Sequence, residues 1–453
     1  MPTERQSIHG QWSSRWTFIM AATGAAVGLG NIWKFPYLTG EHGGSAFVLV
    51  YIVCVAALGI PMMMAEVMLG RRGRQTPVNT LRTLAAEAKV SQGWQVIGWC
   101  GTLAGMLILS YYSVIGGWTL AYILYSATGT FSGITGEGAS ALFNQFVQNP
   151  AAQIGWHTAF MIMTMYIVAR GVQSGLEKAV QYLMPALFGL LLVLVAYATT
   201  TGYFWQGLTF LFTPDFSQLS GTSMLTAMGQ AFFSLSLGMG TIMIYGSYVP
   251  KGTSIASTSV SIALSDTLVA LLAGMAIFPI VFANGLEPRA GPSLIFETIP
   301  VAFGHMTGGL LFGTLFFLLL LVAAWTSSIS LIEPAVTLLI ENYRMTRLRA
   351  AWWCGMVTWL LGFGTAFSFN LWAQVRVFGM TFFDNLDFLT SNLMLPFGGI
   401  LIAIFAGWLL SPDTSRTELN IASPWGYSLW RVLIRYVAPV AVSVVLLHAI
   451  GVL

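Results

Sequence analysis

Apolar segments long enough to cross a membrane recur along the whole chain, and they limit its fold more than any other feature. A helix needs about 20 consecutive apolar residues to cross a hydrocarbon core of roughly 30 Å. Hydrophobic residues make up 56% of the 453 residues and charged residues only 8%, whereas a soluble domain has about 25% charged residues. The sequence therefore predicts an all-α polytopic membrane protein.

We expect eleven membrane spans in a single domain over 1–453, with no cleavable signal peptide before the first span. The expected spans are 12–40, 44–70, 92–126, 153–169, 176–200, 222–249, 256–283, 308–341, 350–370, 376–410 and 427–450.

The basic residues of the loops predict the orientation, because cytoplasmic loops carry an excess of lysine and arginine. With the N-terminus in the cytoplasm, the loop residues that fall on the outer side are Lys34, Arg289 and Arg376. The cytoplasmic loops and their edges then hold Arg71, Arg72, Arg74, Arg82, Lys89, Arg170, Lys178, Lys251, Arg344, Arg347, Arg349 and Arg416. An odd number of spans puts the C-terminus outside. The short loops without glycosylation motifs favour the inner (plasma) membrane of a prokaryote.

The first span is interrupted by "GAAVGLGNIWKFP", residues 24–36, which contains three glycines, an asparagine, a lysine and a proline. A glycine inside a helix costs about 1 kcal/mol relative to alanine. Small residues spaced four apart, here Gly24 and Gly28, also let helices pack closely in lipid. A packing motif is therefore the alternative to a broken helix.

The sixth span contains a similar interruption, "FFSLSLGMGTIMIYGSY", with Gly238 and Gly240 at mid-depth. Because each break opens a set of five helices, the sets 12–200 and 222–410 have opposite orientations, and 427–450 is an eleventh helix. Irregular backbone at membrane depth persists only where it lines a cavity or is buried in protein. The two breaks therefore predict an inverted repeat with a shared site near the midplane.

Broken helices present main-chain groups that suit a zwitterion and a cation. Half-helix N-termini offer free N–H groups to a carboxylate, and C-terminal ends offer free carbonyls to a cation. Hard cations prefer oxygen ligands. Near the breaks and in the eighth span the chain supplies such ligands in Asn31, Ser234, Asp266, Thr326, Ser327 and Ser328.

Four motifs, "GAAVGLGNIWKFP", "SLSLGMG", "YGSYV" and "TSSISLIEP", resemble the neurotransmitter:sodium symporter family, in its bacterial branch of hydrophobic amino-acid transporters. The resemblance covers nearly the whole chain. It implies the LeuT fold, a 5+5 inverted repeat with unwound first and sixth helices. It also implies a symporter that uses sodium to import hydrophobic L-amino acids, aliphatic and aromatic, by alternating access and without chloride.

The alternatives are a transport-inactive amino-acid sensor or a channel of the same fold, and an intramembrane enzyme. The sequence contains no HExxH or GxSxG motif, and its three cysteines lack the spacing of a metal site. An enzyme is therefore not expected. The preferred amino acid and the oligomeric state are not determined by the sequence, and no partner other than sodium, the amino acid and the lipid bilayer is expected.

The resemblance implies two sodium sites. The first would use Ala26, Asn31, Ser234 and Asp266, together with the substrate carboxylate, and the second would use Gly24, Val27, Ala323, Thr326 and Ser327. Many relatives have asparagine where we align Asp266, and those that need chloride lack an acidic group near this sodium. We therefore interpret Asp266 as a sodium ligand that replaces chloride, since a carboxylate within the membrane is costly unless it meets a cation. A carboxylate hydrogen-bonded between packed helices is the alternative.

The substrate-binding residues implied by the resemblance are Ala26, Leu29, Gly30, Ile108, Tyr112, Phe233, Ser234, Ser236, Met239 and Leu331. The substrate contacts would come from the main-chain N–H groups of Leu29 and Gly30, the carbonyls near Phe233 and Ser236, and the hydroxyl of Tyr112. The side-chain walls are apolar, and we expect Gly24 at the position where amine carriers of the family have an acidic residue. A zwitterionic hydrophobic amino acid is therefore favoured.

The resemblance also implies gates and hinges. Lys34 and Asp387 would form the outer gate, and His9, Ser247, Tyr248 and Glu341 the cytoplasmic gate, with Arg5 as the alternative to His9. A histidine close to Glu341 would make this gate sensitive to pH. Gly175 and Pro185 match a segment that unwinds at the cytoplasmic end of the fifth span, Gly238 and Gly240 are expected in the unwound part of the sixth, and Glu66 is expected to hydrogen-bond an unwound segment.

Overall fold

In the computed structural model, which describes residues 5, 7–286, 294–421 and 423–452, the secondary structure is helical apart from one isolated bridge between Val377 and Met380. Arg289 lies outside the described residues. Eight helices of the described part are long and apolar enough to span a membrane. They are Ser45–Gly73, Gln92–Ala127, Val172–Thr199, Ile255–Ala283, Gly309–Tyr343, Arg347–Phe367, Phe382–Leu409 and Pro424–Ala449.

The other three expected spans are also helical, and two of them are interrupted. The span expected at 153–169 is α8 (Pro150–Ala169). The first span is divided into α1 (Arg15–Ala26), a π-helical turn η1 (Gly30–Lys34) and α2 (Phe35–Glu41). The sixth is divided into α11 (Gly221–Ser234) and α12 (Thr241–Ser247). The prediction of two broken spans is confirmed, whereas the division into repeats at 12–200 and 222–410 stays a prediction.

Of the remaining eight spans, three are single helices, and five consist of helical segments that follow one another without a loop. These are α3 (Ser45–Cys54), η2 (Val55–Gly59) and α4 (Ile60–Gly73); η3 (Gln92–Gln95) and α6 (Val96–Ala127); η4 (Val172–Glu177) and α9 (Lys178–Thr199); α13 (Ile255–Ala283); α15 (Gly309–Tyr343); α16 (Arg347–Phe367); α17 (Phe382–Asp387), η7 (Phe388–Met394), α18 (Leu395–Ile404) and η8 (Phe405–Leu409); and α20 (Pro424–Val432), η9 (Leu433–Val437) and α21 (Ala438–Ala449). Short connecting helices are α5 (Pro77–Glu87), α7 (Gly136–Val147), α10 (Phe204–Phe212), η5 (Phe216–Gln218), α14 (Thr298–His305) and α19 (Pro412–Leu419).

Local sequence explains where the broken helices begin and end. Ser14 caps α1 by accepting from the N–H of Thr17, and Ser220 and Ser223 form a capping box at the start of α11. Val27 is extended, with ψ of 110°, so α1 ends there. Gly238 and Gly240 have φ of +79° and +73°, values that glycine adopts without the steric cost that other residues pay.

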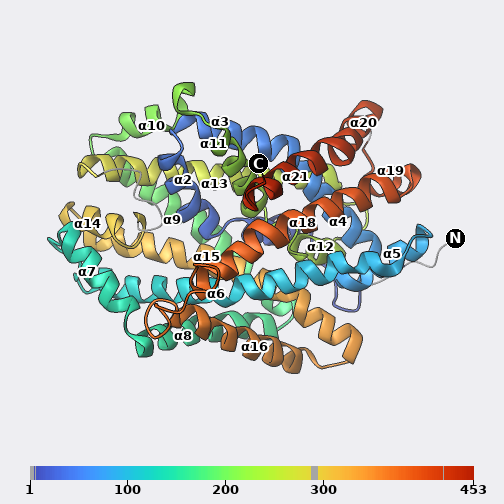
Figure 1. Cartoon of the computed structure of the whole chain (residues 1–453), viewed down its shortest axis with the longest axis horizontal. Helices are drawn as coiled ribbons and strands as arrows, with labels where there is room; N and C mark the ends of the chain where they lie inside the picture. The colour runs from blue at the N-terminus through green and yellow to red at the C-terminus, as the bar shows by residue number, and fades with distance from the viewer. Residues whose placement is uncertain (1–4, 6, 287–293, 422, 453) are drawn as a thin grey trace.

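The broken helices lie inside the bundle. Figure 1 shows the long helices running along the molecule, with α5, α19 and the N-terminus at one end and α7, α10 and α14 at the other. Within this bundle α1 contacts α13, α15 and α9, and α12 contacts α4 and α15. The main-chain groups released at the breaks therefore face protein rather than lipid, as irregular backbone at membrane depth requires.

Candidate functional site

Three side chains from three helices meet beside the first break. Asn31 Nδ2 donates hydrogen bonds to Asp266 Oδ1 at 2.8 Å and to Ser234 Oγ at 3.1 Å, and Ser234 Oγ donates to Asp266 Oδ2 at 2.6 Å. These side chains belong to residues that are at most 1% exposed. The structure thus brings the side chains expected at the first sodium together in one cluster, with the amide nitrogen of Asn31 toward the two oxygens and its Oδ1 accepting from the N–H of Gly28 at 3.1 Å.

Tyr51 of α3 is a member of this cluster that the sequence did not reveal. Its hydroxyl donates to Ser234 Oγ and Asp266 Oδ2, both at 3.3 Å. A tyrosine within an apolar run carries no signal that separates a ligand-cluster residue from a packing residue. Tyr51 orients the carboxylate of Asp266, because a hydroxyl donor fixes the direction in which a carboxylate oxygen points.

A second group of oxygens joins α1 to α15. The hydroxyl of Ser327 donates to the carbonyl of Val27 at 3.0 Å and to that of Gly24 at 3.4 Å. One residue earlier, Thr326 Oγ1 donates to the carbonyl of Ala323 at 3.0 Å. All five residues expected at the second sodium are therefore gathered where the end of α1 meets α15.

A small cavity lies between these two clusters. It has a volume of about 20 Å³ and is lined by Ala25, Ala26, Gly28, Gly30, Ile108, Tyr112, Phe233, Ser236, Met239, Ser327 and Leu331. Such a volume holds about one water molecule, whereas ligand pockets typically have about 300–1,000 Å³. The expected substrate walls therefore come together, but side chains must move before an amino acid fits between them.

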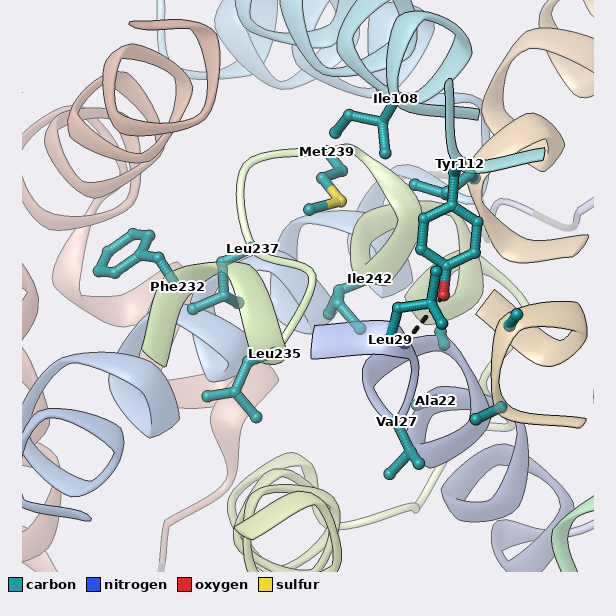
Figure 2. Packing of buried hydrophobic residues seen from close by; sticks show 14 of the residues in the cluster. Ala22, Val27, Leu29, Ile108, Tyr112, Phe232, Leu235, Leu237, Met239 and Ile242 are labelled. Carbon is teal, nitrogen blue, oxygen red and sulfur yellow. Dashed lines mark hydrogen bonds between the residues drawn. The ribbon is translucent and has the colours of Figure 1, made fainter. Parts of the chain in front are cut away.

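Two main-chain groups at the first break are engaged by side chains at this cavity. The N–H of Leu29 donates to the hydroxyl of Tyr112 at 3.1 Å, and Figure 2 shows this bond beside Met239 and Ile108. Ser236, at φ of +53°, donates to the carbonyl of Ala25 at 2.9 Å. The unwound part of the sixth span therefore contacts the end of α1 directly.

The glycine expected in place of an acidic residue was assigned wrongly. A Cβ atom at Gly24 would meet Met184 Sδ and Thr326 Cβ, outside the cavity. A Cβ atom at Gly28 would meet the hydroxyls of Ser327 and Tyr112 at 2.5 and 2.7 Å, and Gly28 lines the cavity. The pocket-facing glycine is therefore Gly28, four residues later and beyond the end of α1.

Glu66 supports the unwound segment from α4. Its Oε1 accepts a hydrogen bond from the N–H of Gly238 at 2.7 Å, and the residue is completely buried. This N–H has no helical partner because the chain turns away at Gly238. A carboxylate acceptor stabilises such a main-chain donor by more than a neutral group does.

On the predicted outer side, Lys34 and Asp387 are not paired in this structure. Lys34 Nζ lies over the ring of Phe233, 4.5 Å from its centroid. Asp387 instead accepts from Ser391 at 2.8 Å and from Tyr111 at 3.3 Å. The cation–π contact holds Phe233 in place. The ring of Phe233 lines the small cavity and also a larger cavity of about 380 Å³, so it separates the two, and Lys34 lines the larger one.

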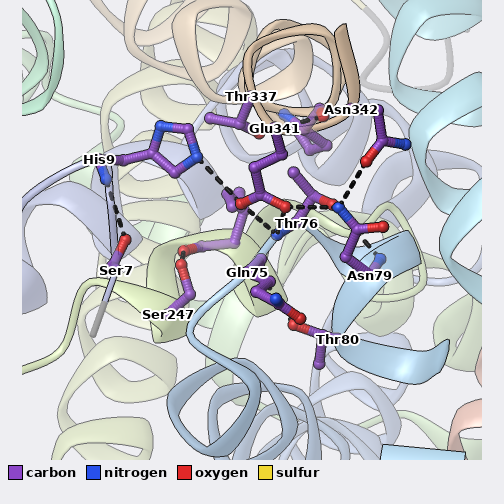
Figure 3. A network of polar contacts seen from close by, with 12 residues as sticks. Ser7, His9, Gln75, Thr76, Asn79, Thr80, Ser247, Thr337, Glu341 and Asn342 are labelled. Carbon is purple, nitrogen blue, oxygen red and sulfur yellow. Dashed lines mark hydrogen bonds and ion pairs between the residues drawn. The ribbon is translucent and has the colours of Figure 1, made fainter. Parts of the chain in front are cut away.

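On the predicted cytoplasmic side, Glu341 is the centre of a polar network, shown in Figure 3. It contacts His9 Nε2 at 3.0 Å and accepts from the N–H of Thr76 at 2.9 Å and from Asn79 Nδ2 at 2.7 Å. Arg5 pairs with Glu87 instead. His9 rather than Arg5 therefore faces Glu341 in this conformation.

The other two residues expected in this gate make different contacts. The hydroxyl of Ser247 donates to the carbonyl of Ile244, within its own helix. Tyr248 packs edge-on against the ring of His9, but its hydroxyl donates to Glu333 at 2.9 Å. Neither side chain hydrogen-bonds Glu341, so the gate is arranged differently from the expectation.

Glu333 and Arg347 form a buried ion pair that the sequence analysis missed. Arg347 donates to both carboxylate oxygens, at 3.0 and 2.6 Å, and Glu333 is 0% exposed. The signal was present, because an acidic residue within an apolar span is a functional candidate by the same argument as Asp266. The pair ties α15 to α16 and, through Tyr248, to the end of α12.

The segment expected to unwind is helical here. Gly175 lies in the π-helix η4, and Pro185 lies inside α9. Met184, next to Pro185, packs against Gly24. The fifth span therefore covers the second oxygen cluster from the side, and its unwinding stays a prediction.

The donor chemistry of both clusters fits a hard monovalent cation. Every candidate ligand is a carbonyl, hydroxyl, amide or carboxylate oxygen, the type that hard cations prefer. Within the described part of the chain, no three His, Cys, Asp or Glu residues gather as they do around a transition metal.

Comparisons with known proteins agree with this geometry. The chain matches the sequence model of the "Sodium:neurotransmitter symporter family" over residues 9–136 and 145–453. It is 39% identical over 446 residues to an uncharacterized sodium-dependent transporter, YhdH, of Bacillus subtilis, covering 98% of both chains. It is 35% identical over 441 residues to an uncharacterized sodium-dependent transporter of Haemophilus influenzae, covering 96% of both.

A solved structure shares the fold. The crystal structure of MhsT in complex with L-phenylalanine superposes with a TM-score of 0.89 at 42% sequence identity, covering 97% of this chain and 99% of that one. The fold is therefore the LeuT fold. The protein is a sodium-dependent symporter that belongs to the sodium:neurotransmitter symporter family.

Proposed function

We propose that the protein imports hydrophobic L-amino acids, aliphatic and aromatic, together with two sodium ions and without chloride. It would do so across the inner (plasma) membrane, with its N-terminus in the cytoplasm and its C-terminus outside. The observation that carries the proposal is the cluster of Asn31, Ser234 and Asp266 beside an apolar cavity at the two breaks.

The charge of Asp266 supports independence from chloride. A sodium ion and the carboxylate of Asp266 neutralise one another, so the buried site needs no additional anion. The substrate carboxylate then adds one negative charge, and its ammonium group is matched by carbonyls at the end of α1 and in the unwound sixth span. Sodium bound at Asn31 and Ser234 thereby stabilises the bound amino acid.

The cavity walls support a hydrophobic substrate. The side chains of Ile108, Phe233, Met239 and Leu331 line the cavity, and the part of the lining that the structure describes contains no acidic side chain. The MhsT structure, at 42% identity, was solved with L-phenylalanine. Phe233 and Met239 have rotatable side chains that can open the contracted cavity around a substrate.

Alternating access would follow from the positions of the two gates. The cytoplasmic side is closed by His9, Glu341 and Trp12, whose indole N–H donates to the carbonyl of Tyr245 at 3.0 Å. The larger cavity lies beyond Phe233 on the other side. Inward movement of sodium is favoured by the membrane potential, by about 2.3 kcal/mol per charge per 100 mV.

Uptake by the purified protein in proteoliposomes tests the proposal. We expect accumulation of labelled phenylalanine or leucine with an inward sodium gradient, in chloride and in gluconate alike, and none with potassium. Binding of the amino acid without accumulation would indicate a sensor, and uptake that ignores the sodium gradient would indicate a channel. Either result would overturn the proposal, and so would a requirement for chloride.

A further inference from the structure

Three arginines gather at the start of the last helix, at the end of the bundle that holds the N-terminus. Arg431 and Arg435 lie one turn apart on α20 and η9, and Arg416 lies on α19. None of them lies near the sodium clusters or the substrate cavity, so the transport mechanism does not account for them.

Arg435 stacks on aromatic rings while part of its guanidinium has no partner. Its Cζ lies 3.9 Å from the ring centroid of Trp408 and 5.6 Å from that of Tyr436. Its Nε is buried and makes no hydrogen bond. The indole N–H of Trp408 donates to the carbonyl of Arg435 at 2.9 Å, which fixes the ring beneath the guanidinium.

The backbone lets the segment that carries Arg435 come close to the segment that carries Trp408. A Cβ atom at Gly407 would lie 3.1 Å from Cα of Arg435, so glycine permits the close approach of the two segments. Both segments are π-helical here, η8 on one side and η9 on the other. Short π-helical turns of this kind occur frequently at functional sites.

The other two arginines converge on Tyr427. Arg431 Nη1 donates to the hydroxyl of Tyr427 at 3.2 Å and to Ser415 Oγ at 3.3 Å. The guanidinium of Arg416 lies over the ring of Tyr427, 4.8 Å from its centroid. All the contacts of this pair are with neutral groups.

No carboxylate neutralises the three charges within the part of the chain that the structure describes. The nearby Glu418 pairs with Arg71 at 3.2 Å and with Arg72 at 3.4 Å, and no ion pair joins it to the three arginines. By contrast, Arg347 at the start of α16 is neutralised by Glu333 of α15. The cluster therefore leaves three positive charges available to an anion from outside the chain.

The position of the cluster indicates which anion is available. Arg435 is eleven residues from Pro424, or about 16 Å along the helix at about 1.5 Å per residue. Its guanidinium nevertheless lies near the membrane interface, because its stacking partner Trp408 is one residue before the end of its own span at Leu409, and tryptophan and tyrosine side chains are enriched at this interface.

We propose that Arg431, Arg435 and Arg416 bind the phosphodiester headgroup of an anionic phospholipid, in the leaflet that faces the N-terminal end of the bundle. Guanidinium groups bind phosphate through paired N–H donors, and basic pockets between membrane helices bind anionic headgroups. Trp408 and Tyr436, 48% and 51% exposed, flank the bound lipid. The site is independent of the proposed transport function.

Native mass spectrometry of the full chain with equal amounts of phosphatidylglycerol and phosphatidylcholine tests this site. We expect wild-type protein to retain phosphatidylglycerol preferentially. The R431Q/R435Q variant should lose about 25-fold of that preference, about fivefold for each charge removed. R349Q is the matched control, because Arg349 is an exposed arginine at the same end of the bundle on α16, and it should keep the wild-type ratio.

Two further variants keep the test decisive if the double variant fails to fold. R435K keeps the charge but not the planar donors, and R416Q removes the most exposed arginine, so each should lower the preference by less than R431Q/R435Q. Wild-type ratios in folded R435K and R416Q, or in folded R431Q/R435Q, would overturn the proposal. Displacement of phosphatidylglycerol by millimolar inorganic phosphate would overturn it too, because the site would then bind free anions rather than lipid.

Discussion

The main-chain N–H of Leu29 donates a hydrogen bond to the hydroxyl of Tyr112 at 3.1 Å, at the point where the first span leaves its helix (Figure 2). Both groups are donors that we assign to the carboxylate of the substrate. In the contracted cavity the oxygen of Tyr112 accepts from the N–H of Leu29, whereas an incoming carboxylate would accept from both groups. Binding therefore exchanges a neutral hydrogen bond for two charge-assisted ones.

Replacing Tyr112 by phenylalanine should weaken substrate binding without unfolding the protein. Hydrogen bonds to charged groups contribute about 1.5–3 kcal/mol, so we expect the apparent affinity for phenylalanine to fall about 10- to 100-fold. Competition binding in the presence of sodium measures this change. Tyr182→Phe, at a position that is 76% exposed, is the control and should bind as wild type does. Equal affinities for wild type and Tyr112→Phe would contradict the assignment.

Replacing Asp266 by asparagine should weaken sodium binding and make transport depend on chloride. The substitution leaves a buried cation without its counter-charge, a change that costs about 3–5 kcal/mol in comparable buried pairs. Sodium titration of amino-acid binding in chloride and in gluconate measures both effects. Asp215→Asn, in an exposed loop, is the control. If Asp266→Asn keeps the sodium affinity of the wild type, the carboxylate belongs to helix packing alone.

Breaking the ion pair of Glu333 and Arg347 should destabilise the protein. Arg347→Gln leaves the fully buried carboxylate unpaired, and we expect the free energy of unfolding to fall by about 3–5 kcal/mol. Thermal unfolding in detergent shows the change as a lower melting temperature. The double variant Glu333→Gln/Arg347→Gln should recover part of the loss because no unpaired charge remains. A double variant less stable than Arg347→Gln would indicate that the two side chains act separately.

Replacing Glu341 by glutamine should loosen the N-terminal segment. Glu341 is the shared acceptor for His9, Thr76 and Asn79, and a neutral amide accepts fewer and weaker hydrogen bonds. We expect faster hydrogen exchange around Trp12, measured by mass spectrometry, and unchanged exchange in α16. Glu137→Gln, near the opposite end of the bundle, controls for the loss of one charge. Unchanged exchange at Trp12 would show that its own hydrogen bonds to α12 hold the segment.

The sequence predicted the parts of the site that depend on backbone chemistry and missed those that depend on side-chain direction. Glycines and serines at mid-depth indicated both breaks, because such residues are costly in an uninterrupted helix. The choice of Gly24 over Gly28 failed because the helix ends between the two, at Val27, and a sequence does not say which glycine faces the cavity. Lys34 was expected to pair with Asp387, but in the conformation that the structure describes it lies over the ring of Phe233. The partner of a gate residue depends on the state of the gate, which the sequence does not specify.

Unwinding of the fifth span is the step that the described conformation does not display, and Pro185 offers the sharpest test of it. A proline inside a helix costs about 3 kcal/mol because it removes a hydrogen bond and clashes with the preceding turn. Replacing Pro185 by alanine should strengthen α9 and slow sodium release to the cytoplasmic side by at least about tenfold, measured as efflux of labelled sodium from preloaded proteoliposomes. Gly175 is less suitable, since a Cβ atom there would lie 2.3 Å from the carbonyl of Ile167 and would disturb packing directly.

Pro279→Ala is the matched control, because Pro279 also lies inside a long helix. It is near the C-terminal end of α13, whereas Pro185 is near the N-terminal end of α9, and it lies away from the second oxygen cluster. Met184 connects Pro185 to that cluster through its contact with Gly24. If the fifth span opens to let the ion out, strengthening α9 slows release and strengthening α13 does not. Equal slowing by both substitutions would point to a general effect of helix rigidity, and normal release from Pro185→Ala would show that sodium leaves by another route.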